Sequence, residues 1–355
     1  MYPVAGGAKP TESYSMRIGV IAPPWLPVPP PAYGGTESAI DLLARGLDAA
    51  GHDVVLVTTG DSTCPVERAW VYESAEWMSR GSSAELRHVV YAYDVVRDCD
   101  VVHDHTLVGP VYAADRVTPP VVTTVHSLFN AELVDIYRAV ADRVAIIAIS
   151  RCQAENAGLP IAAVIHHAVD TAATPMGSGD GGYVLFLGRM GADKGAHRAA
   201  RAARAAGTKL IIAAKMREPA ERVYFEQHVA PLLGPGVEFV GEVDRATKTE
   251  LLCGARALVN PIRWREPFGM VMIEALACGT PVLAFPEGAA PEIVEDGVNG
   301  FLCADEERLA ARIADAAQLD RNACRASAAA RFSVERMVAR HVELYERLTR
   351  ELAAA

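Results

Sequence analysis

The segment Arg265–Val282 reads REPFGMVMIEALACGTPV and combines a loop, a short helix and the start of a strand. Pro267 and Gly269 interrupt any helix that begins before them and permit a tight turn. The apolar residues that follow predict a short buried helix that ends near Gly279. The next apolar run is bounded by prolines and is typical of a buried parallel strand. This order of loop, helix and strand predicts an α/β fold.

Two carboxylates flank the predicted start of this helix. Glu266 precedes the start, and Glu274 lies about two turns further on. A helix N-terminus attracts phosphate, and a carboxylate can accept hydrogen bonds from two neighbouring hydroxyls. The pair would suit a ligand that joins a sugar, a diphosphate and a ribose. The alternative is that Glu266 is a solvated loop acid and Glu274 is the partner of an arginine.

Length and composition indicate a globular chain of two domains, with 355 residues of which 51% are hydrophobic. The longest apolar runs stay below 18 residues, so we expect no membrane-spanning helix. Residues 1–15 lack the pattern of a secretory signal and are expected to be a disordered or tag-like extension. The seven cysteines are scattered and include no Cys-x-x-Cys, which favours a reducing cytoplasm over disulfides or a zinc site.

Charge is distributed unevenly along the chain. Residues 1–168 carry 11 basic and 19 acidic side chains, a net charge of −8, whereas the whole chain has −10. An acidic N-terminal half disfavours nucleic acid and anionic lipid as partners. Arginine and alanine are frequent and lysine is scarce, which is typical of a high-GC coding bias.

Strands and helices alternate twice along the chain, which predicts two doubly wound parallel sheets. The first unit spans 16–170 and the second 183–333, joined by a linker of small residues at 171–182. Residues 60–81 are expected to be irregular, with a short helix as an alternative. Strands are predicted over 17–22, 53–59, 101–103, 121–125, 144–149, 161–165, 183–187, 209–213, 237–240 and 257–259, and helices over 36–50, 84–98, 131–141, 195–206, 305–330 and 333–352.

A glycine pair follows the first predicted strand. Gly34 and Gly35 come before Thr36, which could cap a helix that runs to about Ala50. A strand, a glycine-rich turn and a helix allow a backbone to approach a phosphate closely. An ordinary loop with a helix cap explains this segment equally well.

Several polar residues stand at the carboxyl ends of predicted strands, where ligands of parallel sheets gather. They include His103, His105, His126 and Ser150. His126 could contact a ligand or be a core histidine. His103, Asp104 and His105 could suggest a metal, but strand alternation sends neighbouring side chains to opposite faces, and we expect no metal.

The second unit contains a basic turn after its first strand. Residues 188–195 read GRMGADKG. Arg189 offers a planar fork to phosphate oxygens and Lys194 a compact positive charge. The alternative is a turn with two solvated basic residues.

Three motifs in this order resemble those of the retaining glycosyltransferases of family four. They are the glycine pair at 34–35, the turn with Arg189 and Lys194, and Glu266-x7-Glu274. The flanking segment 291–302, PEIVEDGVNGFL, is also similar to that family. Ala168 departs from it, because a glycine usually precedes Val-Asp there. The resemblance implies the GT-B fold, with two facing Rossmann-like domains, a central cleft and a C-terminal helix, about 334–355, that crosses back to the first domain.

The resemblance also implies roles for individual residues. The helix N-terminus at 268–271 would help to stabilise the leaving diphosphate, and Val243 and Lys248 would contact the nucleobase, although Lys248 could also be a solvated helix-start residue. The implied catalytic residues are Glu266, His126, Arg189 and Lys194. The implied donor-binding residues are Gly34, Gly35, Arg189, Lys194, Val243, Lys248, Glu266, Phe268, Gly269, Met270, Val271 and Glu274.

The expected activity is retaining, metal-independent transfer of a sugar from a nucleoside-diphosphate sugar, with UDP favoured, to a hydroxyl. The acidic first half favours a soluble acceptor, such as an antibiotic or oligosaccharide intermediate of a bacterial, actinomycete-like pathway. No cofactor is expected. Two alternatives stay open: a mannosyltransferase that uses GDP-mannose and a glycolipid, and a non-catalytic nucleotide-sugar binding protein. A third alternative is an epimerase-like or phosphorylase-like enzyme of the same fold. A phosphorylase would need a lysine that binds pyridoxal phosphate, and the residues around the lysines of this sequence do not suggest one.

Overall fold

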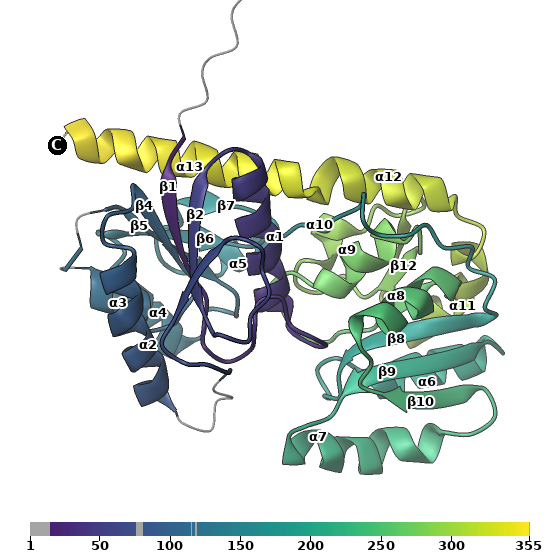
Figure 1. Cartoon of the computed structure of the whole chain (residues 1–355). Coiled ribbons are helices and arrows are strands. Elements are labelled where there is room, and N and C mark those ends of the chain that lie inside the picture. Colours follow the sequence, from purple (N-terminus) through teal and green to yellow (C-terminus); the bar gives the residue numbers. More distant parts are fainter. Residues whose placement is uncertain (1–14, 76–80, 115, 118, 355) are drawn as a thin grey trace, which may run out of the picture.

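The computed structural model describes residues 15–75, 81–114, 116–117 and 119–354. The chain forms two parallel β-sheets, each covered by helices, which lie beside each other beneath a long C-terminal helix (Figure 1). This confirms the prediction of two doubly wound α/β units. The expected N-terminal extension lies outside the described residues except for Ser15.

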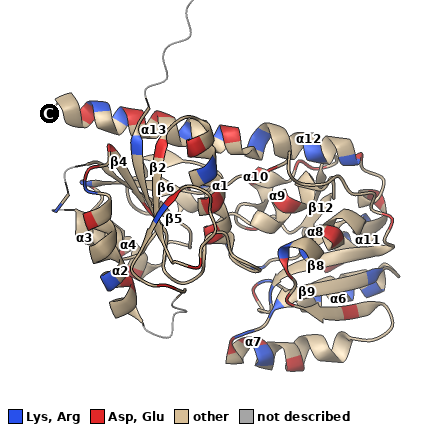
Figure 2. Ribbon diagram, in the orientation of Figure 1, with Lys and Arg blue, Asp and Glu red and all other residues tan. Residues whose placement is uncertain are grey.

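The first sheet has the strand order β3-β2-β1-β4-β5-β6-β7, and all of its pairings are parallel. Most of its strands are buried along nearly their whole length, which explains why they read as apolar runs rather than as alternating patterns. Figure 2 shows that few strand residues are charged. The strands are β1 (Arg17–Ile21), β2 (Asp53–Thr58), β3 (Glu67–Trp70), β4 (Val101–Asp104), β5 (Val121–Val125), β6 (Val144–Ala148) and β7 (Ala163–Val164).

Two predictions for the first unit were wrong. The segment 60–81 contains the edge strand β3, which is half exposed and lacks the apolar run that marks the other strands. Thr36 does not cap the first helix, because the helix already begins at Gly35 and its N-cap is Gly34. The helices of this unit are α1 (Gly35–Ala49), α2 (Ser82–Val95), α3 (Gly109–Ala113), α4 (Ala131–Arg138) and α5 (Arg151–Glu155).

The second sheet has the order β10-β9-β8-β11-β12-β13 and is also parallel throughout. Its strands are β8 (Tyr183–Arg189), β9 (Lys209–Lys215), β10 (Val237–Gly241), β11 (Leu258–Asn260), β12 (Val282–Ala284) and β13 (Gly300–Leu302). Its helical segments are α6 (Ala196–Ala205), α7 (Pro219–Tyr224), the π-helical turn η2 (Phe225–Val229), the 3-10 turn η3 (Ala230–Leu232), α8 (Arg245–Gly254), α9 (Met270–Ala277), α10 (Ala290–Ile293), α11 (Glu306–Ala316) and α12 (Arg321–Phe332).

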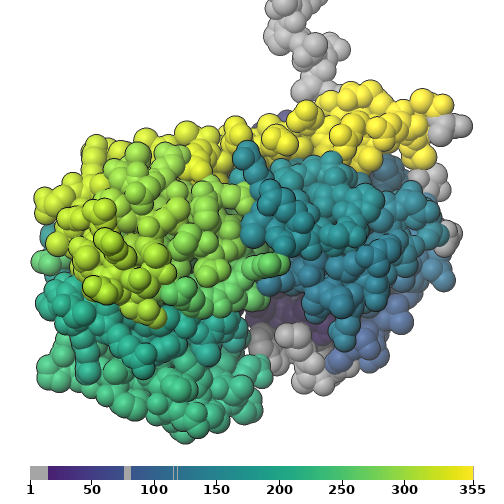
Figure 3. Space-filling model, turned by 180° about the vertical axis from the view of Figure 1, so that it is seen from behind, coloured from purple at the N-terminus to yellow at the C-terminus, as the bar shows by residue number. Residues whose placement is uncertain are grey.

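The last helix, α13 (Val334–Ala354), returns to the first unit and packs on α1. From behind, the yellow C-terminal segment runs along both halves of the molecule (Figure 3). The two helices touch at Gly46, where an added Cβ would lie 2.6 Å from Val338. Tyr345 is fully buried in the core of the first unit and bonds His103. Within the described residues, no helix combines the length and apolar content that crossing a bilayer requires.

Candidate active site

A cavity of about 430 Å³ lies between the carboxyl-end loops of the two sheets and is lined by residues of both units. It brings together every predicted site residue except Arg189. Those residues are Gly34, Gly35, His126, Lys194, Val243, Lys248, Glu266, Phe268, Gly269, Met270, Val271 and Glu274.

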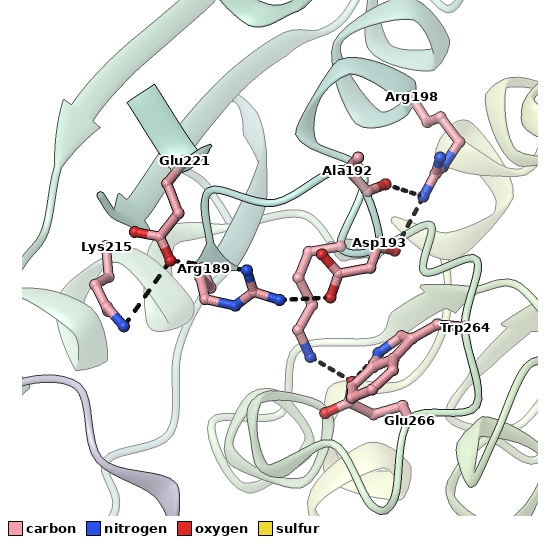
Figure 4. Close-up of polar contacts among 9 residues, drawn as sticks. Arg189, Ala192, Asp193, Arg198, Lys215, Glu221, Trp264 and Glu266 are labelled. Carbon is pink, nitrogen blue, oxygen red and sulfur yellow. Dashed lines mark hydrogen bonds and ion pairs between the residues drawn. The ribbon is translucent and has the colours of Figure 1, made fainter. Parts of the chain in front are cut away.

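Two predicted catalytic residues that line the cavity form an ion pair, and Figure 4 shows its carboxylate, Glu266, beside Trp264. Lys194 Nζ donates a hydrogen bond to Glu266 Oε2, and Trp264 Nε1 donates to the same oxygen. The ammonium also lies 5.1 Å from the centre of the Trp264 ring, within cation–π range. Only 13% of the Lys194 side chain and 15% of the Glu266 side chain are exposed. Glu266 is therefore a paired, largely buried carboxylate rather than a solvated loop acid.

The loops that carry this pair are held by backbone contacts. Arg198, on α6, donates to the carbonyl oxygens of Ala192 and Asp193, each at 3.0 Å, and so fixes the turn before Lys194. The Glu266 loop packs against Gly288, where an added Cβ would lie 2.3 Å from both the backbone nitrogen and oxygen of Glu266. Gly288 has a φ of +57°, so both its backbone conformation and the close contact require glycine.

A second ion pair involves Glu274, eight residues after Glu266. Lys248 Nζ, on α8, donates to Glu274 Oε1 at 2.6 Å, so Lys248 is paired rather than simply solvated. Helix α9 begins at Met270, within the predicted helix N-terminus at 268–271, and Gly269, with a φ of +98°, serves as its N-cap. Phe268 consequently precedes the helix, and its ring packs against His166 and His167.

Arg189 does not line the cavity. Its Nη2 donates to Asp193 Oδ2 at 2.7 Å, and its Nη1 lies 3.7 Å from Glu221 Oε1. In this structure the guanidinium is turned towards two carboxylates of its own unit. Its role in phosphate binding stays a prediction.

The cavity is also lined by residues that were not predicted from the sequence, above all Lys215, together with Tyr33, Arg217 and Glu242. Lys215 ends β9 and is the register partner of Arg189 at the end of β8. The predicted strand 209–213 stopped two residues too early. A predicted strand that ended at Lys215 would have identified this residue as a candidate, because ligands gather at the carboxyl ends of parallel strands.

The predicted histidines separate into two groups. His103 is fully buried and bonds Tyr345 at 2.6 Å and Thr124 at 2.8 Å, as a structural core histidine does. His126 reaches the cavity, and its Nε2 lies 2.9 Å from Nδ1 of His105. Burial lowers the pKa of both His105 and His126 well below the ordinary value, so the two rings are neutral near pH 7.

Asp104 faces away from these histidines. It accepts hydrogen bonds from the Tyr93 hydroxyl and the Thr106 amide, both at 2.7 Å. Across the part of the chain that the structure describes, no group of three or more His, Cys, Asp or Glu side chains is arranged to hold a metal ion.

Glu37 is a buried carboxylate at the cavity wall, in the first turn of α1. Burial raises its pKa from 4.5 to about 7. The folded protein thus binds this proton more tightly than the unfolded chain. The free energy of unfolding therefore keeps its full contribution from Glu37 below pH 4.5. It falls by about 3 kcal/mol as the pH rises through 7.

We therefore expect Glu37→Gln to unfold at a higher temperature than the wild type at pH 8, with the two melting temperatures converging near pH 5. Thermal unfolding followed by circular dichroism measures this difference. Glu132→Gln, on the exposed start of α4, is the matched control and should keep the wild-type pH dependence. Equal pH profiles for Glu37→Gln and the wild type would contradict the buried-acid interpretation.

Two facing parallel-sheet units and a charged cavity between them are the architecture of a GT-B glycosyltransferase. Comparison with known families agrees: the Glycosyltransferase Family 4 model matches residues 33–173, and the Glycosyl transferases group 1 model matches residues 177–331. The chain belongs to this glycosyltransferase family, which confirms the resemblance that the three motifs indicated.

Relatives and solved structures support this assignment. The chain is 28% identical to a phosphatidyl-myo-inositol mannosyltransferase of Mycolicibacterium smegmatis, over 81% of this chain and 80% of the relative. It is similar to the crystal structure of a glycosyltransferase involved in avilamycin A biosynthesis, with a TM-score of 0.71, 26% identity and coverage of 96% and 99%. The fold is also shared with the Anabaena protein HepE, solved with UDP-glucose, at a TM-score of 0.71, 21% identity and coverage of 96% and 100%.

Proposed function

We propose that this enzyme transfers a sugar from a nucleoside-diphosphate sugar, with UDP favoured, to a hydroxyl of a soluble acceptor, retaining the anomeric configuration and needing no metal ion. The observation that carries this proposal is the pairing of Lys194 with Glu266 and of Lys248 with Glu274 along one wall of the cavity. Each pair offers a cation for phosphate or base and a carboxylate for hydroxyl groups.

The leaving diphosphate develops negative charge as the glycosidic bond breaks. Lys194 and the N-terminus of α9 would stabilise that charge, with Arg189 turning towards the phosphates on binding. These fixed positive groups would take the part that a divalent cation has in other phosphate-transfer sites. Glu266 would then orient the hydroxyls of the donor sugar, and Glu274 would hold the ribose.

The acceptor hydroxyl would approach from the first unit, past His126. We infer front-face attack, in which the departing phosphate helps to remove the hydroxyl proton while that oxygen bonds to the anomeric carbon. No covalent glycosyl-enzyme step is proposed, because Glu266 and Glu274 are assigned to the donor hydroxyls and the ribose rather than to attack on the anomeric carbon. His126 would contact the sugar as a neutral imidazole.

The likeness to a glycosyltransferase of avilamycin A biosynthesis supports a soluble, antibiotic-type acceptor. The UDP-glucose complex of a protein with the same fold supports a UDP-sugar donor. All seven cysteines are free thiols, which is consistent with our proposal that the reaction takes place in the cytoplasm.

A second candidate is mannosyl transfer from GDP-mannose to a glycolipid. The similarity to a phosphatidyl-myo-inositol mannosyltransferase favours it. Binding to vesicles that contain phosphatidylinositol, together with a preference for GDP over UDP, would support this candidate. Failure to bind such vesicles supports the soluble acceptor.

A thermal-shift panel with UDP, GDP, ADP and dTDP tests the donor site. We expect one nucleotide to raise the melting temperature of the wild type, and Glu274→Ala to reduce that shift because the ribose loses its carboxylate acceptor. Glu250→Ala, at an exposed position of α8, should keep the full shift. A wild type that responds to none of the four would contradict the proposed donor site.

A further inference from the structure

Helix α1 begins at the cavity and carries a buried acid there. The helix lies on the side of the first unit that faces the second (Figure 1), and Glu37, in its first turn, lines the cavity. Glu37 is 6% exposed. Its carboxyl group lies against the glycine turn, since a Cβ added at Gly34 would be 3.0 Å from Glu37 Oε2. The group is therefore part of the cavity wall at this turn.

The carboxyl group of Glu37 has unused hydrogen-bonding capacity. In the part of the chain that the structure describes, its hydrogen-bond partner is its own backbone amide. A carboxyl group can make several hydrogen bonds. Burial raises the pKa of Glu37 to about 7, so near neutral pH the group can donate as well as accept. Buried polar groups normally have partners, and a ligand in the cavity can supply the missing one.

Glu85 is a buried acid at the same kind of position, but with a structural role. It lies in the first turn of α2, is also 6% exposed, and accepts a hydrogen bond from the Leu107 amide at 2.7 Å. It does not line the cavity. A contact within the first unit therefore accounts for the burial of Glu85, whereas Glu37 faces the cavity instead.

The wall around Glu37 has little charge. Of the described lining residues, Glu37 is the one Asp, Glu, Lys or Arg that the first unit contributes. Trp25 and Tyr33 add aromatic surface to the same wall. Burial lowers the pKa values of His126 and His167 well below the ordinary value, so these two lining residues are neutral near pH 7. Aromatic surface with a few polar groups is typical of sites for small molecules.

This wall suits an uncharged acceptor better than an anionic one. The lysines and arginines that line the cavity belong to the second unit, where we assign them to the donor. A phosphate on the acceptor would meet no positive side chain of the described first-unit wall and would lie beside a carboxyl group. An unpaired charge of this kind disfavours one ligand against another.

We propose that Glu37 is an acceptor-binding residue that hydrogen-bonds a hydroxyl of an uncharged, polyhydroxylated acceptor, and that the first unit discriminates against acceptors that carry a phosphate. The inference rests on the proposed function and deepens it by naming the class of acceptor. The departing phosphate of the donor still removes the hydroxyl proton, so Glu37 acts on the binding of the acceptor.

Two matched pairs of probes test the acceptor class without any variant. They are methyl α-glucoside with glucose 1-phosphate, and myo-inositol with myo-inositol 1-phosphate. With a donor that the wild type consumes, we expect kcat/KM to be at least roughly tenfold higher for the neutral member of the pair that it uses. Equal or better use of the phosphorylated member, or transfer to neither neutral probe, would overturn the inference.

Variants of Glu37 test its role in binding that neutral probe. Glu37→Ala should raise KM by about 5-fold to 50-fold, as loss of a hydrogen bond to a buried hydroxyl does, and change kcat by less than about twofold. Glu37→Gln should raise KM by less than about threefold, because its amide still donates and accepts. An unchanged KM for Glu37→Ala, or a loss confined to kcat, would contradict the binding role.

Glu85→Ala is the matched control, because it removes an equally buried acid that lies outside the cavity lining. It should lower the melting temperature, since the Leu107 amide loses its partner, and leave KM unchanged. Equal increases of KM in Glu37→Ala and Glu85→Ala would attribute the effect to stability and refute the inference. A wild type that consumes none of the donors refutes the proposed function, whereas donor consumption with an unchanged KM for Glu37→Ala refutes only this inference.

Discussion

Lys194→Ala is expected to slow sugar transfer by roughly 10²–10³-fold, because it removes one preorganised charge from the developing diphosphate. The effect should appear in kcat and also in the affinity for the nucleoside diphosphate, since Lys194 would contact the phosphates before and during bond cleavage. Steady-state kinetics and calorimetry on the same preparation separate the two quantities.

Lys209→Ala is the matched control for this variant, because Lys209 is an exposed lysine of the same unit that pairs with Glu238. It should transfer sugar at the wild-type rate. Near-normal turnover by Lys194→Ala would refute the assignment of this residue to the diphosphate.

Glu266→Gln is expected to reduce transfer by roughly 10²-fold or more, because the carboxylate that orients the donor sugar becomes a neutral amide. Its effect on nucleotide affinity should be opposite to that of Lys194→Ala. Glu266 holds Lys194 in the structure, so removing its charge releases the ammonium for phosphate. The affinity for the nucleoside diphosphate should therefore stay unchanged or rise while kcat falls.

Glu287→Gln is the control, because this acidic residue of the following loop lies outside the cavity lining. It should leave both kcat and nucleotide affinity unchanged. A Glu266→Gln variant that loses nucleotide affinity in proportion to its activity would show that the residue supports the structure of the site rather than the donor sugar.

The sequence predicted the parts of this site that lie within one segment. The apolar helix of α9, the turn before it and the positions of Glu266 and Glu274 all follow from a run of about 18 residues. Helix α9 begins at Met270, within the predicted helix N-terminus at 268–271, because Gly269 adopts a positive φ and serves as its N-cap.

The contacts between distant segments could not be predicted in the same way. Lys194 and Glu266 are 72 positions apart and pair only because β8 and the loop before α9 end at the same side of the sheet. Tyr33 and Lys215 come from different units and meet across the cavity. Arg189 bonds Asp193 because of its side-chain conformation, which cannot be predicted from a pattern of residues.

The most direct test of the proposed activity is the release of nucleoside diphosphate from a panel of UDP-, GDP-, ADP- and dTDP-sugars, measured in the presence of a chelator and of hydroxylated acceptors. We predict that the wild type consumes sugars of one nucleotide series under these conditions and that Lys194→Ala consumes them at least tenfold more slowly. A wild type that binds a nucleotide tightly yet consumes none of the donors would contradict the account and indicate a nucleotide-sugar binding protein.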